Sequence, residues 1–397
     1  MTFVGMLISL LVSQITCAAD NYQFSKLTGA GVVQIDIQAP EAASAIDPEK
    51  SISAIEVKRK TMSLKETAWK NLDQIADLKI VVVGDTGCRL KEGKKGDEYQ
   101  DCRDPKQWPF PEIMKQVEKE NANLILHVGD YHYREQCLAG KPCQKMSDVV
   151  GYGWLPWKKD FFEPAEKSLK KTPWLLVRGN HEDCDRAYLG YEHLMANENV
   201  ASKCVDYEEP DYIKLKDLLI VNFDSSSISD KLLTDKAVAA LWEARFKAIS
   251  DRVESEKIKN VWLVTHKPIY GLVKMGTSAA PTNINLQKYF EASPLKSKVQ
   301  WVLSGHVHVS QILKAKDGPF QFVLGNGGTQ LDDFQEFLQK SEIQSLGFDF
   351  FRSENPGFGY ALLSRHKKSQ KWTITFKDAN GKTLSTQKEP FDVAKSK

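Results

Sequence analysis

Five apolar runs in this 397-residue chain end in side chains that can bind metals or move protons. The runs are followed by Gly84-Asp85-Thr86-Gly87, Gly129-Asp130, Gly179-Asn180-His181-Glu182, Thr265-His266-Lys267-Pro268 and Ser304-Gly305-His306-Val307-His308. Carboxylate oxygens, amide oxygens and imidazole nitrogens are ligands for hard and borderline transition metals. Because the carboxyl ends of strands in open α/β sheets converge on one crevice, we expect the five segments to form one metal-binding site.

Each motif also has an ordinary structural explanation. Gly-Asp and Gly-Asn pairs are common turn residues, and a single histidine such as His266 is often a core or surface residue. The pair His306 and His308 is a stronger signal, because residues two apart project to the same side of an extended segment. It is the placement of all five motifs at strand ends that favours a metal site over five independent turns.

The apolar runs predict the strands of a layered α/β domain with mixed sheets, from about 78 to 390. Leu78–Val83 is typical of a strand buried on both faces. Further strands are predicted at 122–128, 173–179, 212–224, 260–266, 299–305, 320–326, 359–366 and 371–378, with helices at 110–121, 157–171 and 231–257. Residues 20–77 form a polar, weakly patterned N-terminal extension with a helix near Ser63–Leu78, and 391–397 form a short tail.

The first nineteen residues indicate export. They carry no charged side chain, and their apolar stretch, Val4–Val12, is too short to span a bilayer. Small residues follow, as in a cleaved secretory signal, although the usual early Lys or Arg is missing. A disordered or buried N-terminus is the alternative, and a lipoprotein signal at Cys17 fits poorly. We therefore expect a secreted or periplasmic protein, with no second membrane segment.

Composition and cysteine content agree with this expectation. The chain is 42% hydrophobic and 27% charged, as in soluble globular proteins. A net charge of +2 gives no reason to expect a nucleic-acid coat and is compatible with an anionic substrate. Without Cys17, six of the seven cysteines remain, which suggests disulfides in an exported chain. Nearest-neighbour pairing would join 88–102, 137–143 and 184–204. Free buried thiols are the alternative, and no Cys-x-x-Cys spacing suggests zinc.

The series GDTG, GDYHY, GNHE, THKP and GHVH resembles the calcineurin-like metallophosphoesterases over roughly residues 78–390. Within that superfamily, a tyrosine three residues after the second aspartate is typical of purple acid phosphatases. Tyr133 stands at that distance from Asp130. The resemblance implies an α/β/β/α sandwich with mixed sheets.

The resemblance also implies two metal ions that share Asp130. One metal would be held by Asp85, Asp130, Tyr133 and His308, and the other by Asp130, Asn180, His266 and His306. A phenolate suits Fe(III), and the second metal would be Fe, Zn or Mn. Two cations roughly 3.5–4 Å apart can neutralise a phosphate ester and lower the pKa of a bound water, so that hydroxide forms at ordinary pH. His181 matches the family's non-ligand histidine beside the phosphate.

Some residues depart from the family pattern or stay open. Relatives often have Asn and an apolar or aromatic residue after the bridging aspartate, where this chain has Tyr131 and His132. His132 either faces the pocket or packs at the surface, and His127, inside an apolar strand, is expected in the core. Gly325–Gly328 resembles the glycine-rich strand end that follows GHxH in relatives. It is either a structural turn or a wall of the active site, where backbone can come close to a neighbour.

These observations predict an exported phosphohydrolase with two metals, acting as an acid phosphatase-type phosphomonoesterase on a phosphate ester. The nearest alternative is the same metal core acting on phosphodiesters or nucleotide pyrophosphates. A third hypothesis is a non-catalytic secreted binding protein, which the complete ligand set argues against. Oligomeric state and physiological substrate do not follow from the sequence.

Overall fold

The computed structural model describes most of the chain. Its described residues are 20–40, 48–91, 98–147, 149–197, 203–276, 278–333, 338–355 and 357–391. The predicted signal peptide, 1–19, lies outside the described residues, as does the predicted tail except for Phe391. No helix in the described part of the chain is long and apolar enough to cross a membrane.

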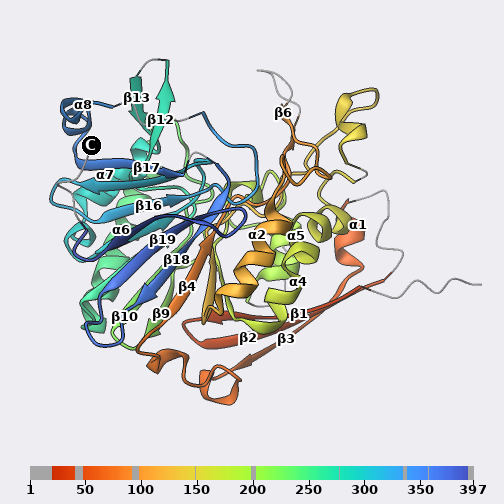
Figure 1. Ribbon diagram of the computed structural model, residues 1–397, viewed down its shortest axis with the longest axis horizontal. Helices are drawn as coiled ribbons and strands as arrows, with labels where there is room; N and C mark the ends of the chain where they lie inside the picture. Colours follow the sequence, from red (N-terminus) through yellow and green to blue (C-terminus); the bar gives the residue numbers. More distant parts are fainter. Residues whose placement is uncertain are drawn as a thin grey trace, which may run out of the picture.

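Two mixed sheets form the centre of the fold (Figure 1). In spatial order, the larger contains β20 (Thr383–Lys388), β19 (Trp372–Asp378), β18 (Gly359–Arg365), β4 (Lys79–Val83), β7 (Leu124–His127), β8 (Trp174–Leu176), β1 (Asp20–Thr28), β2 (Gly31–Ala39) and β3 (Glu56–Met62). The smaller contains β17 (Phe348–Asn355), β15 (Ser310–Ala315), β16 (Phe320–Leu324), β14 (Trp301–Ser304), β11 (Asn260–Thr265), β10 (Leu218–Phe223) and β9 (Asp211–Leu215). The pairs β4–β7, β7–β8 and β11–β14 are parallel, whereas the outer strands are mostly antiparallel.

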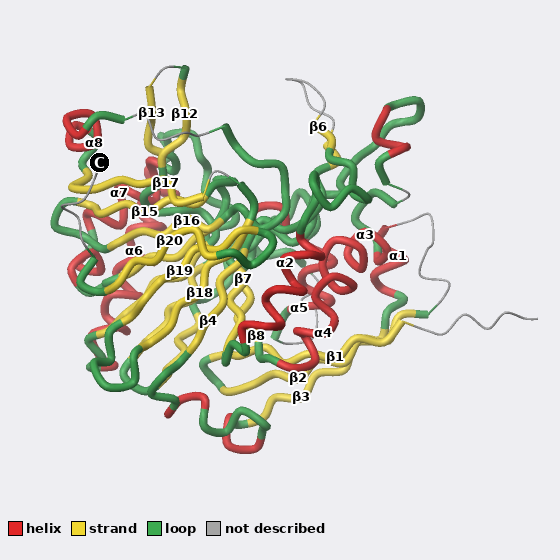
Figure 2. Tube along the Cα trace, in the orientation of Figure 1, coloured by secondary structure: helices red, strands yellow, loops and turns green. Residues whose placement is uncertain are grey.

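The sheets pack face to face, and helices cover their outer faces (Figure 2). The larger sheet is covered by α2 (Phe110–Val117), α4 (Glu163–Lys171) and α5 (Tyr188–Met195), and the smaller by α6 (Lys236–Glu256) and α7 (Ile284–Ala292). Shorter elements are α1 (Pro48–Ser53), α3 (Trp154–Trp157), α8 (Lys340–Ser345) and the hairpins β5 (Leu90–Lys91) with β6 (Glu98–Tyr99) and β12 (Leu272–Met275) with β13 (Ser278–Pro281). The predicted α/β/β/α sandwich is confirmed.

The core between the sheets explains the apolar runs. Ile80, Val82, Leu124 and Leu126 of the larger sheet pack with residues of the smaller sheet, and all four are fully buried. The ring planes of Trp262 and Trp301 are stacked with centroids 4.5 Å apart, and Trp372 lies 4.6 Å from Trp262. Val81, Val83 and Ile125 of the same two strands face the helices instead, so β4 and β7 are apolar on both sides.

The N-terminal extension departs from the prediction. Its strands β1 to β3 extend the larger sheet, because β1 pairs in parallel with β8 at Lys26 and Trp174. The alternation of Val33, Ile35 and Ile37 with polar residues in β2 was the available signal.

The helix predicted near Ser63–Leu78 is wrong. That segment contains two short 3-10 turns, Leu64–Glu66 and Leu72–Gln74. The hydroxyl of Thr67 donates to the Leu64 carbonyl and accepts from the Trp69 amide, and Thr67 itself is extended. A threonine that bonds to the local backbone in this way competes with helix formation.

The three nearest-neighbour disulfides are present in the structure. Cys88–Cys102, Cys137–Cys143 and Cys184–Cys204 have Cα–Cα distances of 5.7, 5.9 and 5.7 Å. Cys88 lies one residue after the Gly84–Gly87 motif and Cys184 lies two residues after Glu182. Two of the bridges therefore tie down loops that carry candidate metal ligands.

Candidate metal centre

The five motifs meet at one end of the two sheets. Asp85, Asp130 and Asn180 follow β4, β7 and β8 of the larger sheet, and His266 and His306 follow β11 and β14 of the smaller one. Side chains from both layers therefore reach the same place, as predicted from the strand ends.

Sharp backbone turns aim these side chains. Asp85, Asp130 and His306 have φ angles of 56°, 57° and 71°, in the left-handed region that non-glycine residues rarely occupy. Gly129 has φ +97°, and a side chain there would place its first carbon 2.5 Å from Nδ1 of His266. Strained backbone of this kind is typical of functional sites held by the surrounding structure.

The first group of donor atoms surrounds the hydroxyl of Tyr133. That oxygen lies 2.7 Å from Oδ2 of Asp130, 3.2 Å from Oδ1 of Asp85 and 3.0 Å from Nε2 of His308. Tyr133 and Asp85 are at most 1% exposed, and His308 is 9% exposed. The four residues predicted to hold the first metal thus meet at the Tyr133 hydroxyl.

The second group surrounds the side-chain oxygen of Asn180. Oδ1 of Asn180 lies 3.0 Å from Nε2 of His266 and 2.7 Å from Nδ1 of His306. Nε2 of His266 also lies 3.2 Å from Oδ2 of Asp130. The same Asp130 oxygen therefore contacts both groups, the position expected of a bridging carboxylate.

Hydrogen bonds behind the histidines select the nitrogen that faces the cluster. Nδ1 of His266 lies 2.8 Å from the Val128 carbonyl, and Nδ1 of His308 lies 2.8 Å from the Gln330 carbonyl. A carbonyl only accepts, so each Nδ1 carries the proton and each Nε2 presents a lone pair to the cluster. This is how metal-ligating histidines are usually oriented.

The electrostatics of the cluster fit a cation. Burial and the nearby charge of Asp130 raise the pKa of Asp85 well above its usual range. Burial, Asp130 and Asp85 likewise raise the pKa of the Tyr133 phenol. Burial alone would raise the pKa of Asp130 too, but His266 and His181 lower it well below its usual range. Negative charges on buried oxygen atoms repel one another, and a bound metal ion would offset that repulsion. Asp85, Asp130 and His266 place donor atoms within 4.8 Å of one another.

His181 lies beside the cluster without joining either group. Its ring centroid is 3.8 Å from that of Tyr133, and its Nε2 is 3.8 Å from Oδ2 of Asp130. Its Nδ1 lies 2.8 Å from Oε1 of Glu135, which also lies 2.5 Å from Nη2 of Arg186. Burial and Arg186 lower the pKa of His181 to about 4. The carboxylate of Glu135 therefore turns Nε2 of His181 toward the candidate metals.

A family model of the calcineurin-like phosphoesterases matches residues 78–310. The chain belongs to this family. A comparison with curated proteins gives no match. The family assignment agrees with the convergence of the five motifs: members of this superfamily are metal-dependent hydrolases, and Asp85, Asp130 and His266 form a group that could hold a metal ion.

Solved structures show the same fold at low sequence identity. Purple acid phosphatase PPD1 from yellow lupin (Lupinus luteus) seeds aligns with a TM-score of 0.52 and 15% identity, over 89% of this chain and 58% of that chain. PhoD aligns with a TM-score of 0.54 and 11% identity, over 94% and 88%. GAP50, the anchor in the inner membrane complex of Plasmodium, aligns with a TM-score of 0.50 and 16% identity, over 79% and 88%. The chain thus spans little more than half of the lupin enzyme, and these likenesses concern the fold alone.

The remaining sequence expectations for this phosphoesterase are largely met. His132 packs between Tyr152 and Trp157 with Nε2 2.8 Å from the Gly151 carbonyl, so the packing alternative holds. His127 is buried in the core, 2.9 Å from the Thr86 hydroxyl. A side chain at Gly325 would come within 2.9 Å of Oδ2 of Asp85, so this glycine allows a close approach of the wall to the site.

Two buried carboxylates that hold the loops of the phosphoesterase were missed by the sequence analysis. Glu182 accepts hydrogen bonds from the amides of Gly179, Asp130, Tyr131 and His132, at 2.9 to 3.2 Å. It therefore joins the Asp130 and Asn180 turns. Its place directly after Asn180 and His181 in a strand-end turn was a usable signal.

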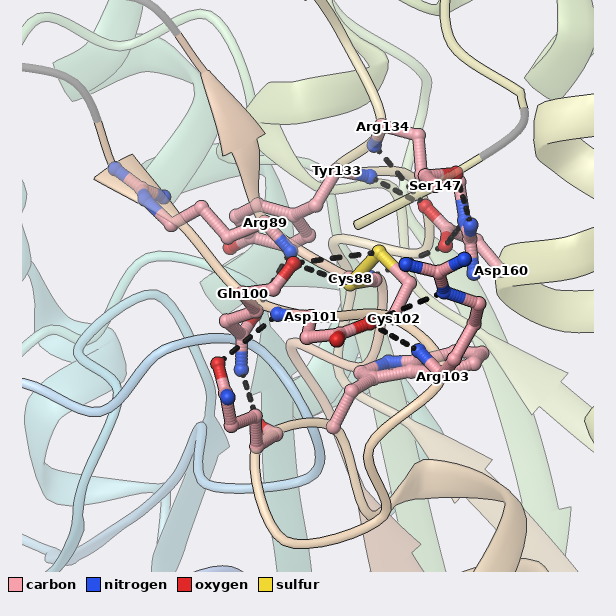
Figure 3. The surroundings of a disulfide bond; sticks show 12 residues. Cys88, Arg89, Gln100, Asp101, Cys102, Arg103, Tyr133, Arg134, Ser147 and Asp160 are labelled. Carbon is pink, nitrogen blue, oxygen red and sulfur yellow. Dashed lines mark hydrogen bonds and ion pairs between the residues drawn. A yellow bond between two sulfur atoms is a disulfide. The ribbon is translucent and has the colours of Figure 1, made fainter. Parts of the chain in front are cut away.

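Asp160 plays the same role between the first two motifs (Figure 3). It accepts from the amides of Cys88, Tyr133 and Arg134 at 3.1, 2.8 and 3.1 Å, and from Nε of Arg134 at 2.6 Å. Asp160 lies in a π-helical turn, Lys158–Phe162, between α3 and α4. No motif surrounds it in the sequence, and π-turns are frequent at functional sites.

We expect Asp160→Asn to destabilise the protein by about 3–5 kcal/mol, because it leaves the buried guanidinium of Arg134 without its carboxylate. Urea unfolding followed by circular dichroism gives the free energy of unfolding. The control is Asp251→Asn, which breaks an exposed ion pair with Lys247 and should cost less than about 1 kcal/mol. Equal costs for both variants would contradict the role given to Asp160.

Proposed function

We propose that this phosphoesterase is an exported phosphohydrolase with two metal ions, acting as a phosphomonoesterase of the purple acid phosphatase type. Asp85, Asp130, Tyr133 and His308 would hold one metal, and Asp130, Asn180, His266 and His306 the other. The observation that carries the proposal is the position of Oδ2 of Asp130, 2.7 Å from the Tyr133 hydroxyl and 3.2 Å from Nε2 of His266.

Bound there, two cations supply Lewis acidity toward a phosphate ester and lower the pKa of water. The chain's own residues supply position and proton handling. The left-handed turns at Asp85 and Asp130 present the carboxylates, and backbone carbonyls orient His266 and His308. His181 would contact the substrate, because its Nε2 faces the cluster while Glu135 holds the opposite nitrogen.

Tyr133 favours Fe(III) at the first position, because a phenolate is a hard anionic ligand. The second metal would be Fe, Zn or Mn, whose ordinary ligands include the imidazole nitrogens of His266 and His306. Three disulfides and the signal-like segment at 1–19 support export, since disulfides persist in oxidising compartments.

Two alternatives use the same fold. Phosphodiesters or nucleotide pyrophosphates would need only different pocket loops around the same donors. A non-catalytic binding role is the other alternative, and the fold is shared with an anchor protein of Plasmodium. The complete set of seven donor side chains favours catalysis over simple binding, because an unused centre gives no reason to keep buried carboxylates together at an electrostatic cost.

The central test is Asp130→Ala, which removes the shared ligand and should lower bound metal and reduce hydrolysis to near background. Elemental analysis is combined with rates on a chromogenic phosphomonoester and the matching diester. Asp251→Ala is the control and should keep both metals and activity. Normal metal content and turnover in Asp130→Ala would contradict the two-metal proposal. A preference of the wild type for the diester would favour the first alternative.

Tyr133 provides a spectroscopic test of the first metal. If it binds Fe(III), the oxidised protein should absorb visible light, and Tyr133→Phe should remove the band. Tyr131→Phe is the matched control, because the Tyr131 hydroxyl points away from the cluster to the Val177 carbonyl at 2.9 Å. An iron-loaded wild type without visible absorption would argue against the purple acid phosphatase branch, while leaving hydrolysis to be judged separately.

His181→Ala tests the role of the imidazole. If His181 protonates the leaving group, its loss should slow alkyl phosphates by roughly 10²–10⁴-fold but activated aryl phosphates far less. Bound metal should stay constant, and the exposed His366→Ala should change neither rate. Equal losses across leaving groups with metal retained would indicate phosphate stabilisation instead, and loss of metal would indicate that His181 supports the ligand loop.

A further inference from the structure

The strand β5 runs beside the segment that carries Tyr133. Leu90 and Arg134 form a parallel bridge, with the Leu90 amide 3.0 Å from the Tyr133 carbonyl and the Glu135 amide 3.1 Å from the Leu90 carbonyl. Side chains alternate along such segments. Leu90 and Arg134 are buried at 0% and 3% exposure, whereas Arg89 and Lys91 are partly exposed. Arg89 and Lys91 therefore share the face that also carries Tyr133 and Glu135.

That face adjoins the candidate metal centre. Arg89 lies beside the Tyr133 ring (Figure 3), with its guanidinium carbon 5.6 Å from the ring centroid. The Tyr133 hydroxyl in turn contacts Asp130, Asp85 and His308. The Arg89 side chain is 15% exposed. A ligand at the metal centre that extended past Tyr133 would meet this arginine.

The nearby carboxylates do not fully neutralise the positive charge on this face. Arg186 contacts Glu135 at 2.5 Å, and Arg89 pairs with Glu98 through Nε at 2.5 Å. Glu98 is 46% exposed, and exposed ion pairs are worth little, so an incoming anion can compete for Arg89. Lys91 has no ion-pair partner among the described residues. Burial and the charges of Arg186 and Arg89 lower the pKa of Lys91, while Glu135 and Glu98 act in the opposite direction.

We propose that Arg89 and Lys91 form a second anion subsite on the Tyr133 side of the metal centre, which binds a second phosphoryl group of the substrate. The inference rests on the proposed hydrolysis at that centre. An arginine fork pairs with two phosphate oxygens, and a lysine supplies a compact positive charge. A monoester of a neutral alcohol brings no second anion to these two cations, whereas a monoester that carries a second phosphate group does. The preferred substrate is therefore a phosphomonoester that carries a second phosphate group close to the one that is hydrolysed.

The test compares methylphosphonate with methylenediphosphonate, two non-hydrolysable ligands that differ by one phosphoryl-like group. Calorimetry on the metal-loaded wild type should show the diphosphonate bound at least roughly tenfold more tightly, the value expected for one additional favourable contact. Lys91→Met and Arg89→Met should each lower that preference by roughly tenfold, and Lys91→Arg should retain it. The control is Lys167→Met on α4, an exposed cation outside the motifs, which should leave the preference unchanged. Malonate should bind no more tightly than methylphosphonate if the subsite takes a phosphoryl group and not any second anion.

Equal affinity of the wild type for the two phosphonates overturns the subsite. So does a Lys91→Met variant that weakens both ligands by the same factor, because the lysine would then act on the centre as a whole. Bound metal and the unfolding midpoint are measured for each variant, and Lys91→Gln replaces Lys91→Met if the latter does not fold. Hydrolysis of a chromogenic monoester is measured separately. A wild type that hydrolyses nothing refutes the proposed function, while the ratio of the two binding constants still decides whether the subsite exists.

Discussion

The buried carboxylate of Asp130 is the constraint on which the rest of the site depends. Its side chain is 1% exposed and contacts Tyr133, His266 and the amide of His181. Burying a charge costs free energy unless it is paired and hydrogen-bonded. Near it lies a second buried carboxylate, Asp85, whose pKa is raised by burial and by Asp130. Two acids with oxygens within 4.8 Å of one another in a protein interior are an arrangement that a cation stabilises.

The candidate ligands lie at the ends of strands from both sheets. Asp85 and Asp130 come from neighbouring parallel strands, β4 and β7, and each takes a left-handed conformation directly after a glycine. The hydrogen bonds from Asp85 to the Gly129 carbonyl and from Thr86 to the Asp130 carbonyl hold the two turns side by side. His266 and His306 reach the same point from the smaller sheet. Because both sheets share a packed tryptophan core, the distance between the two halves of the centre is set by packing far from it.

The sequence analysis predicted the local motifs at the strand ends but missed several contacts between segments that are far apart in the chain. A glycine, then a polar residue, at the end of an apolar run can be recognised without a structure, so the positions of Asp85, Asp130, Asn180, His266 and His306 were predictable. The pairing of β1 with β8 was not, because it joins residues far apart in the chain. The helix predicted near Ser63–Leu78 does not form, because the Thr67 hydroxyl bonds to the backbone of Leu64 and Trp69, which helical periodicity does not reveal. The role of Asp160 was also hidden, since the carboxylate lies in a helical segment and no motif surrounds it.

Two buried carboxylates hold the loops that carry the candidate ligands. Glu182 holds the Asp130 and Asn180 turns together through backbone amides, and Asp160 does so for Cys88 and Tyr133. Acceptors of this kind satisfy buried amides that would otherwise be costly. Neither Glu182 nor Asp160 is a candidate ligand, so the loops are held by carboxylates that are distinct from the candidate ligands. A binding site whose geometry is fixed by such supporting residues keeps its donor atoms in position before any ligand arrives, which is the condition for catalysis by positioning.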